Sequence, residues 1–402
     1  MTTSIAVAAR SSGVRWAVLG AYALLAASTQ LLWLTFAAVD TRTAAAMHVS
    51  VGLVGDLAAV FPFVYIVLAL PTGRWLDARF AQALGTGALL TGAGALIRVF
   101  APDSFGWQMA GQVVISAGQP LVLNSINKLA AHYFAPHERA TAISIGTAAL
   151  FVGILAAVLI AGPLFDAGGL RLLLWVQAIP SAVIAVVMVV ALRTPPFYPE
   201  DPSAAASLRW LVHDRFMWTL AALVFIGMGT YNAVATWLQP ILASFNEGDA
   251  AGGLIAALTF AGVLGAAVLP TAAARTGRRR LVLIVALIVA AVAFLAIAAI
   301  HNLVWLGVWM FATGFVLLAA LPVVLDWSGI HAGAERQGAA VGFLMMAGNL
   351  GGLILVLIIQ PVIGNPYISL GILVVIAVLG LPIVLRLPAR TDRPVHDAHQ
   401  NR

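Results

Sequence analysis

The sequence predicts an all-α membrane protein in which twelve transmembrane helices form two related six-helix bundles. Three observations predict this class: an apolar composition, apolar runs of bilayer length and an internal repeat. Hydrophobic residues make up 62% of the 402 residues and charged residues only 9%, whereas soluble domains are about 45–50% apolar. We therefore expect the chain to lie in a lipid bilayer.

The apolar runs have the length and continuity of transmembrane helices. A bilayer core about 30 Å thick requires about 20 apolar residues per helix, and only helices or closed barrels satisfy their own backbone there. The runs do not alternate every second residue, so helices are favoured. The first run is too long for a signal peptide and lacks a cleavage site, so we expect it to remain as a helix. The predicted spans are residues 16–39, 51–71, 81–100, 107–131, 140–162, 172–192, 216–243, 251–273, 281–300, 304–325, 337–359 and 369–386.

Short motifs of the first half recur in the second at a nearly constant separation. Pro71 closes a span before a basic turn, as Pro270 does later, and the segments QPLVLN and HERATA are matched by LPVVLD and AERQGA. Duplicated six-helix halves are typical of transporters with a site at the interface of the repeats. A proline-rich stretch without an apolar run separates the halves. The predicted organisation is an N-terminal bundle over 1–192, a cytoplasmic linker over 193–215 and a C-terminal bundle with a short tail over 216–402.

The basic residues fall almost entirely on one side of the predicted membrane. Of 21 lysines and arginines, only Arg42, Arg98 and Arg171 lie toward the opposite side. Because cytoplasmic loops carry the excess of positive charge, both termini are expected in the cytoplasm and the chain in the inner cell membrane. This asymmetry accounts for the net charge of +6 without a nucleic-acid partner, which would need basic residues clustered on one soluble surface.

The turn after the second span carries a motif of a known transporter family. Gly73 is followed by Asp77 and then by Arg79, and on these residues the chain resembles the major facilitator superfamily. Phe80 and Gln82 depart from the family pattern, which usually has a glycine and a basic residue there. The resemblance implies the major facilitator fold of two pseudo-symmetric six-helix bundles and the transport of a small solute.

A longer resemblance indicates one branch of this superfamily. The segment WLDARF, together with GQVVISAGQPLVLNSINKLAAHYFAPHERATA, is similar to the relatives of the feline leukaemia virus subgroup C receptor. The chain resembles a bacterial member of this branch, whose members transport choline, ethanolamine, pyridoxine or haem. In the branch, aromatic residues of the first and seventh spans and glutamines of the fourth and eleventh hold the solute. This implies the same role for Trp33, Tyr231, Gln119 and Gln360.

Polar side chains in four predicted spans are candidates for solute binding. Polar groups at bilayer depth are costly and are expected to face the bundle interior. Tryptophan and tyrosine rings attract quaternary ammonium groups by about 0.5–2 kcal/mol each, without a counter-charge. Alternatively, the amides hydrogen-bond between helices and the aromatic residues lie at the membrane interface. The expected solute-binding residues are Gln30, Trp33, Gln119, Tyr231, Asn232, Gln239, Asn349 and Gln360.

Acidic residues are nearly absent from the predicted spans. Of 15 aspartates and glutamates, only Asp56 lies clearly within a span. Proton-coupled transporters usually need a buried carboxylate, so Asp56 is the possible proton site and facilitative transport is favoured. A solvated Asp56, or one paired with Arg98, is the other interpretation.

The chain contains a single lysine, Lys128, where the fourth span reaches the cytoplasm. Its amine can anchor the helix by extending to the lipid headgroups. Alternatively, it belongs to a gate in which charges of the two halves pair and keep the cytoplasmic side closed. The expected gating residues are Asp77, Arg79, Lys128, Glu138 and Arg139 of the first half and Glu335 and Arg336 of the second.

Together these features predict a facilitative, monomeric transporter that moves a small polar or cationic organic solute, such as a choline-like amine, by alternating access. The alternative is a proton-coupled multidrug or metabolite exporter that uses Asp56. No enzymatic activity is expected, because paired carboxylates, a nucleophile arrangement and a phosphate loop are missing from the sequence. No cofactor or metal is expected either, since the sequence has no cysteine and its histidines lie outside the middle of the predicted spans, which also argues against haem ligation.

Overall fold

The computed structural model of the chain describes residues 2–198 and 208–389, and they form helices joined by short turns. The first half contains α1 (Thr2–Trp33), α2 (Asp40–Met47), α3 (Val51–Ala78), α4 (Phe80–Phe100), α5 (Phe105–Leu123), α6 (Ile126–Tyr133) and α7 (Arg139–Ala191). The second half contains α8 (Arg209–His213), α9 (Arg215–Ala243), α10 (Ala251–Thr276), α11 (Arg279–Ala299), α12 (Leu303–Ala332), α13 (Gln337–Ile359) and α14 (Pro366–Val384). Three single 3₁₀ turns, η1 (Gly248–Ala250), η2 (Ala334–Arg336) and η3 (Gln360–Val362), join helices of the second half.

The prediction of twelve spans in an all-helical fold is confirmed. Ten helices of the described chain are long and apolar enough to cross a membrane. One of them, α7, is broken at Gly168 and Gly169 and therefore supplies two crossings. Gly169 has a φ of 62°, a left-handed conformation that glycine adopts without a steric penalty. The remaining crossing is α5 with α6, whose glutamines reduce its apolar character.

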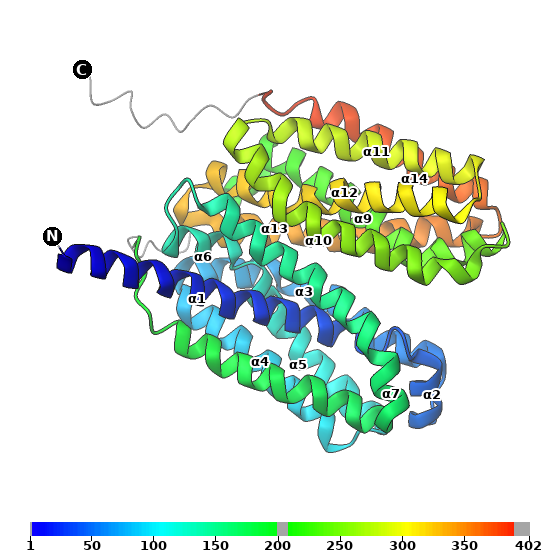
Figure 1. Cartoon of the computed structure of the whole chain (residues 1–402), viewed down its shortest axis with the longest axis horizontal. Coiled ribbons are helices and arrows are strands. Elements are labelled where there is room, and N and C mark those ends of the chain that lie inside the picture. Colours follow the sequence, from blue (N-terminus) through cyan, green and yellow to red (C-terminus); the bar gives the residue numbers. More distant parts are fainter. Residues whose placement is uncertain (1, 199–207, 390–402) are drawn as a thin grey trace.

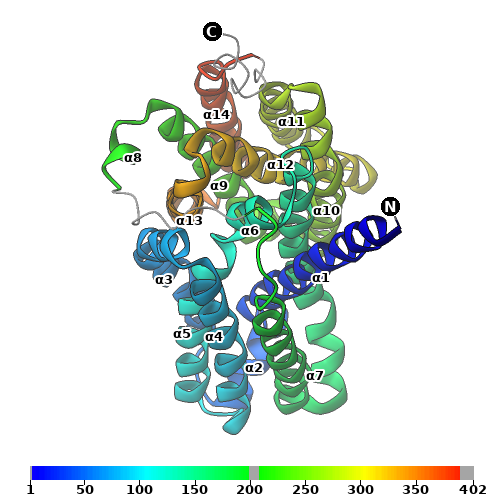
Figure 2. The same cartoon turned by 90° about the vertical axis from the view of Figure 1, so that its left-hand side faces the viewer.

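The two bundles lie beside each other along their length (Figure 1). The start of α1 and the end of α14 lie at the same end of the molecule, which we call the terminal end; the opposite end, where α2 lies, is the far end. Figure 2, seen from the terminal end, shows one bundle stacked on the other. Across the seam between the bundles, α3 packs against α13 and α7 against α10.

Two helices extend beyond the predicted spans and carry acidic residues into the bundles. α3 continues to Ala78 and includes Asp77, and α12 continues to Ala332 and includes Asp326. Both carboxylates are buried. Asp326 is neutralised by Arg279 of α11, whose Nη2 lies 2.6 Å from its Oδ2, so the helix continues through a charged position. The expectation that Asp56 would be the only acid inside a span is therefore wrong.

Candidate functional site

Two adjoining cavities lie between the bundles. The larger has a volume of about 310 Å³, and we call it the polar chamber. The smaller has a volume of about 100 Å³, and we call it the apolar annex. They adjoin because the same six residues line both: Gln30, Trp33, Leu123, Met228, Asn232 and Met345.

Four amide side chains from both bundles line the polar chamber. Gln30 of α1 and Gln119 of α5 come from the first bundle, and Asn232 of α9 and Asn349 of α13 from the second. The two asparagines donate through Nδ2 to the carbonyls of Met228 and Met345, one turn earlier on their own helices, at 3.0 and 2.9 Å. These local bonds fix the amide planes and leave both Oδ1 atoms without a donor among the described residues.

The two glutamines differ from ordinary buried amides. Gln30 and Gln119 are each only 5% exposed, yet within residues 2–198 and 208–389 the structure gives their side chains no hydrogen-bond partner. Nearly all buried polar groups in proteins are hydrogen-bonded. Both amides border the chamber, so water or a bound solute is the partner that the geometry leaves for them.

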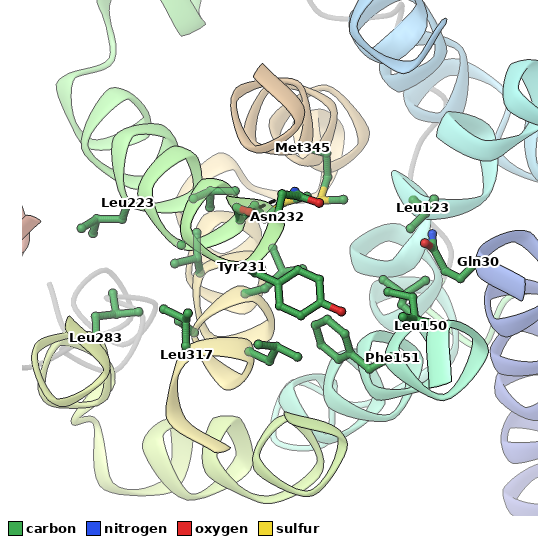
Figure 3. Close-up of a pocket in the computed structure, with 18 of the residues that line it drawn as sticks. Gln30, Leu123, Leu150, Phe151, Leu223, Tyr231, Asn232, Leu283, Leu317 and Met345 are labelled. Carbon is green, nitrogen blue, oxygen red and sulfur yellow. Dashed lines mark hydrogen bonds between the residues drawn. The ribbon is translucent and has the colours of Figure 1, made fainter. Parts of the chain in front are cut away.

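Aromatic rings complete the wall. The Trp33 indole N–H donates to the carbonyl of Ala58 at 2.9 Å, which ties the last residue of α1 to α3. The Phe61 ring lies 6.4 Å from the Trp33 ring. Tyr231 shares a hydrogen bond with Thr259 at 3.3 Å, and its ring meets that of Phe151 from the other bundle at 6.5 Å, as Figure 3 shows. Rings from both halves thus border the cavities.

Two of the expected solute-binding residues lie outside both cavities. Gln239 is exposed on α9, beyond Thr236, the last residue of that helix to line the chamber. Gln360 is exposed because α13 ends at Ile359 and the chain turns into η3. The helical spacing that would have placed Gln360 on the face of Asn349 therefore does not continue that far.

The possible proton site is also outside the cavities. Asp56 is exposed near the start of α3 and lines neither cavity. Among the described residues that do line them, none carries a charge at neutral pH. The predicted pairing of Asp56 with Arg98 is wrong, because the guanidinium of Arg98 is directed into the interior of the first bundle.

Arg98 forms a buried polar network that sequence reasoning missed. It is fully buried, and its Nη1 donates to Leu32 O, Thr35 Oγ1 and Gln112 Oε1 at 3.0–3.2 Å. Its Nη2 donates to Gln177 Oε1 at 3.1 Å. Every one of these acceptors is neutral. The only signal in the sequence was an arginine on the side of the membrane that has few basic residues.

The seam between the bundles is closed at the terminal end by Asp77. Its Oδ1 and Oδ2 accept hydrogen bonds from the backbone N–H groups of Gly338 and Ala339 at 2.8 and 2.9 Å. These donors belong to the first turn of α13, where N–H groups lack partners within the helix and the helix dipole favours an anion. Lys128 supports the carboxylate from its own bundle, with Nζ 3.7 Å from Oδ1 and 3.1 Å from the Asp77 carbonyl oxygen.

Among the described residues, no hydrogen bond or ion pair joins the other expected gating charges across the seam. Glu138 binds Arg15 of its own bundle through two hydrogen bonds of 2.6 and 2.9 Å. Arg139 donates to the Phe134 and Ala131 carbonyls beside it. Arg79, Glu335 and Arg336 are exposed, and the Arg336 guanidinium lies 5.4 Å from the Trp210 ring. Lys128 is thus part of the closed seam and not a headgroup anchor, since it is buried.

Uncharged residues join the bundles at the same end. Asn127 Nδ2 donates to Leu325 O at 2.6 Å, and the hydroxyls of Thr141 and Thr271 lie 3.2 Å apart. Leu325 and Thr271 fall in the repeated motifs of the second half. The repeats therefore mark the positions at which the two bundles touch.

The sequence is similar to those of known transporters. Solute carrier family 49 member A3 of Danio rerio is 30% identical over 273 residues, which cover 63% of this chain and 57% of that protein. The chain thus matches little more than half the length of this relative. The choline/ethanolamine transporter FLVCR2 of Homo sapiens is 22% identical over 385 residues, covering 87% of this chain and 72% of that one.

A solved structure matches nearly the whole chain. A bacterial homologue of the iron transporter ferroportin has a TM-score of 0.77 and 15% identity, covering 92% of this chain and 98% of that one; at this identity the likeness concerns the fold alone. Residues 18–356 match the Major Facilitator Superfamily. The chain therefore belongs to the Major Facilitator Superfamily and is a membrane transporter.

Proposed function

We propose that this transporter carries a small organic amine of the choline type by facilitated diffusion. The single observation that carries the proposal is the composition of the polar chamber. In the described chain, four amides that keep polar atoms without a hydrogen-bond partner line it together with aromatic rings, and no charged residue does. The similarity of this chain to FLVCR2, which is named as a choline/ethanolamine transporter, supports the proposed solute class and the branch of the superfamily that the sequence resembles.

The chamber can bind a quaternary or primary amine through aromatic rings and amides, without a carboxylate. The Trp33 ring, which lines the chamber, attracts a cation by about 0.5–2 kcal/mol, and the Tyr231 ring borders the adjoining annex. The free Oδ1 atoms of Asn232 and Asn349 are acceptors that face the same space. The glutamines Gln30 and Gln119 supply both donors and acceptors for a hydroxyl group. A volume of about 310 Å³ leaves room for the solute and some of its water.

Access to the chamber is proposed to alternate between the two ends of the molecule. The hydrogen bonds between the bundles, in the described part of the chain, all lie at the terminal end. The lining residues include Trp33, which ends α1, and Val356, near the end of α13, so the chamber lies toward the far end. The excess of arginine at the terminal end supports a cytoplasmic position for that end. Breaking the Asp77 seam would then open the chamber to the cytoplasm.

The test is counterflow of labelled choline in proteoliposomes, with and without a pH gradient. We expect exchange that is independent of the gradient, because none of the described residues that border the cavities is a titratable carboxylate. Gln30→Leu and Gln119→Leu are each expected to lower the initial rate about tenfold, as about 1.4 kcal/mol of lost hydrogen bonding implies.

Gln239→Leu is the matched control, because Gln239 is an amide of the second bundle outside both cavities; its rate should equal that of the wild type. Exchange that required a proton gradient, and that Asp56→Asn abolished, would instead establish the proton-coupled exporter. Absence of exchange for choline and ethanolamine alike would reject the proposed solute class.

A further inference from the structure

The apolar annex extends the cavity into the second bundle. It lies among α9, α11 and α12, with α7 of the first bundle closing one side. Figure 3 shows Leu223, Leu283 and Leu317 around it, with Leu150 and Phe151 opposite. Its wall is almost entirely hydrocarbon, in contrast to the amides of the polar chamber.

The polar groups at the annex stand where it meets the chamber. Gln30 and Asn232 line both spaces, and the Tyr231 hydroxyl is bonded to Thr259. Apart from these and the shared Trp33, only side chains of leucine, isoleucine, valine, alanine, methionine and phenylalanine, with one glycine, border the annex in the described chain. A molecule that occupies both spaces would therefore keep its polar head at the amides and extend an apolar part toward Leu283 and Leu317.

The size and apolar lining of the annex define that apolar part. An apolar cavity of about 150 Å³ in a protein stays dry and binds benzene. The annex, at about 100 Å³, is smaller and accommodates about three or four carbon atoms by the same measure. Water has few partners in it, so filling it with hydrocarbon is favourable.

We infer that the site takes an amphipathic amine, with its cationic head in the polar chamber and an apolar group of about three or four carbons in the apolar annex. This inference rests on the proposed function for the charge of the head, and it adds the second half of the ligand. Choline itself would fill only the chamber. The preferred ligand is then a larger amine whose nitrogen carries a short alkyl chain or a small ring.

The experiment measures binding of a homologous series to the purified full chain. The probes are choline and analogues in which one methyl group is replaced by ethyl, propyl, butyl or hexyl, and affinity is followed by thermal stabilisation in lipid nanodiscs. Affinity should rise about fourfold for each added carbon and level off at propyl or butyl. Leu317→Trp, which fills the annex, should abolish the rise and leave the affinity for choline unchanged.

Leu317→Ala provides a second variant in case the tryptophan disturbs folding: it enlarges the annex and should move the optimum to longer chains. Leu295→Trp is the matched control, since Leu295 is 56% exposed on the outer face of α11. It should leave the whole series unchanged. Loss of the rise in Leu317→Trp but not in Leu295→Trp excludes partition of the longer probes into lipid as its cause.

The outcomes separate this inference from the proposed function. If choline exchanges but chain length has no effect, or if Leu317→Trp weakens all probes equally, the annex proposal is overturned alone. If longer homologues bind through Leu317 while choline is not transported, the annex proposal stands and choline transport is rejected. If no amine binds, both are overturned.

Discussion

The largest fully buried side chain in the described part of the chain is charged: Arg98. Its guanidinium donates to Leu32 O, one of the last four carbonyls of α1, which have no partner within the helix. A cation at this end also interacts favourably with the helix dipole. Gln112 accepts from Arg98 and donates to Leu57 O at 3.1 Å, beside the carbonyl that holds Trp33. Arg98 therefore fixes the end of α1 from which Trp33 enters the cavity.

Replacing Arg98 tests this assignment. Arg98→Met keeps the volume approximately but leaves the buried Gln112 Oε1 without its donor and removes one of the two donors to Gln177 Oε1, so we expect a loss of about 2–5 kcal/mol in stability. Thermal unfolding of the purified protein should show it as a drop in Tm of several degrees. Arg42→Met is the control, because Arg42 pairs with Asp166 in an exposed position and such pairs contribute at most about 1 kcal/mol. Equal effects of the two substitutions would refute the role of Arg98.

The positions of some side chains could be predicted from the sequence, and the positions of others could not, for a physical reason. Gln30, Trp33, Gln119 and Asn232 line the chamber as expected, because polar groups in lipid must face inward. The sequence predicts Arg98 only as one of the few basic residues on the side opposite the cytoplasm, and not as a residue of the bundle interior. An arginine near a helix end can extend to water or turn inward, and only the positions of acceptors on other helices decide between the two.

At the scale of helices, α3 and α13 approach so closely that only glycine fits between them. A Cβ atom on Gly73 would lie 2.5 Å from Gly338 O, and one on Gly338 would lie 2.5 Å from Gly73 O. Gly342 has the same relation to Ala69 O. This close approach brings the start of α13 within hydrogen-bonding distance of Asp77. The glycines and the carboxylate thus form one contact that opens or closes as a unit.

Neutralising Asp77 should open this contact. Asp77→Asn retains one acceptor but loses the charge that the first turn of α13 stabilises, at a cost of up to about 2 kcal/mol, and the open state should become about tenfold more populated. The measurement is labelling of Ser328→Cys, a buried seam position, by a maleimide. Asp166→Asn, which removes an exposed acid at the far end, should leave the labelling rate as in the wild type. A rate unchanged by Asp77→Asn would show that the carboxylate does not hold the seam.

The limits of the helices followed from the sequence to within a few residues in most cases, because the bilayer sets the length of an apolar run. The exceptions are informative. α12 continues past its predicted end because Asp326 finds Arg279, a partner on another helix that no local pattern reveals. α2 was not predicted, since eight residues from Asp40 to Met47 are too short and polar to give a membrane signal.

For the whole molecule, the seam at the terminal end is the part that must break for access to alternate. It consists of the Asp77 contact, the Asn127 bond and the meeting of Thr141 with Thr271. The Asp77 contact joins α3 to α13, and the Asn127 bond joins α6 to α12 on the same flank. The threonine contact joins α7 to α10 on the other flank. Closure is therefore distributed over both flanks of the seam, and locking either flank should stop the cycle.

An engineered disulfide can lock one flank. The chain has no cysteines of its own, so two introduced cysteines can pair only with each other. The hydroxyls of Thr141 and Thr271 are 3.2 Å apart, so the two side chains are in contact, as a disulfide between these positions requires. Oxidation of the Thr141→Cys, Thr271→Cys double variant should reduce choline exchange more than tenfold, and a reductant should restore it. Each single variant should be insensitive to oxidant. Full exchange in the cross-linked protein would mean that the bundles do not separate at this end.

The absence of charge on the described walls of the cavities has an energetic consequence. A cation carried there is not neutralised by the protein, so each transport cycle moves one net elementary charge across the bilayer. The membrane potential then acts on the solute directly, with about 2.3 kcal/mol for every 100 mV. Under the proposed facilitative mechanism, an interior-negative voltage of that size would concentrate a monovalent amine about 50-fold inside the cell without a second ion.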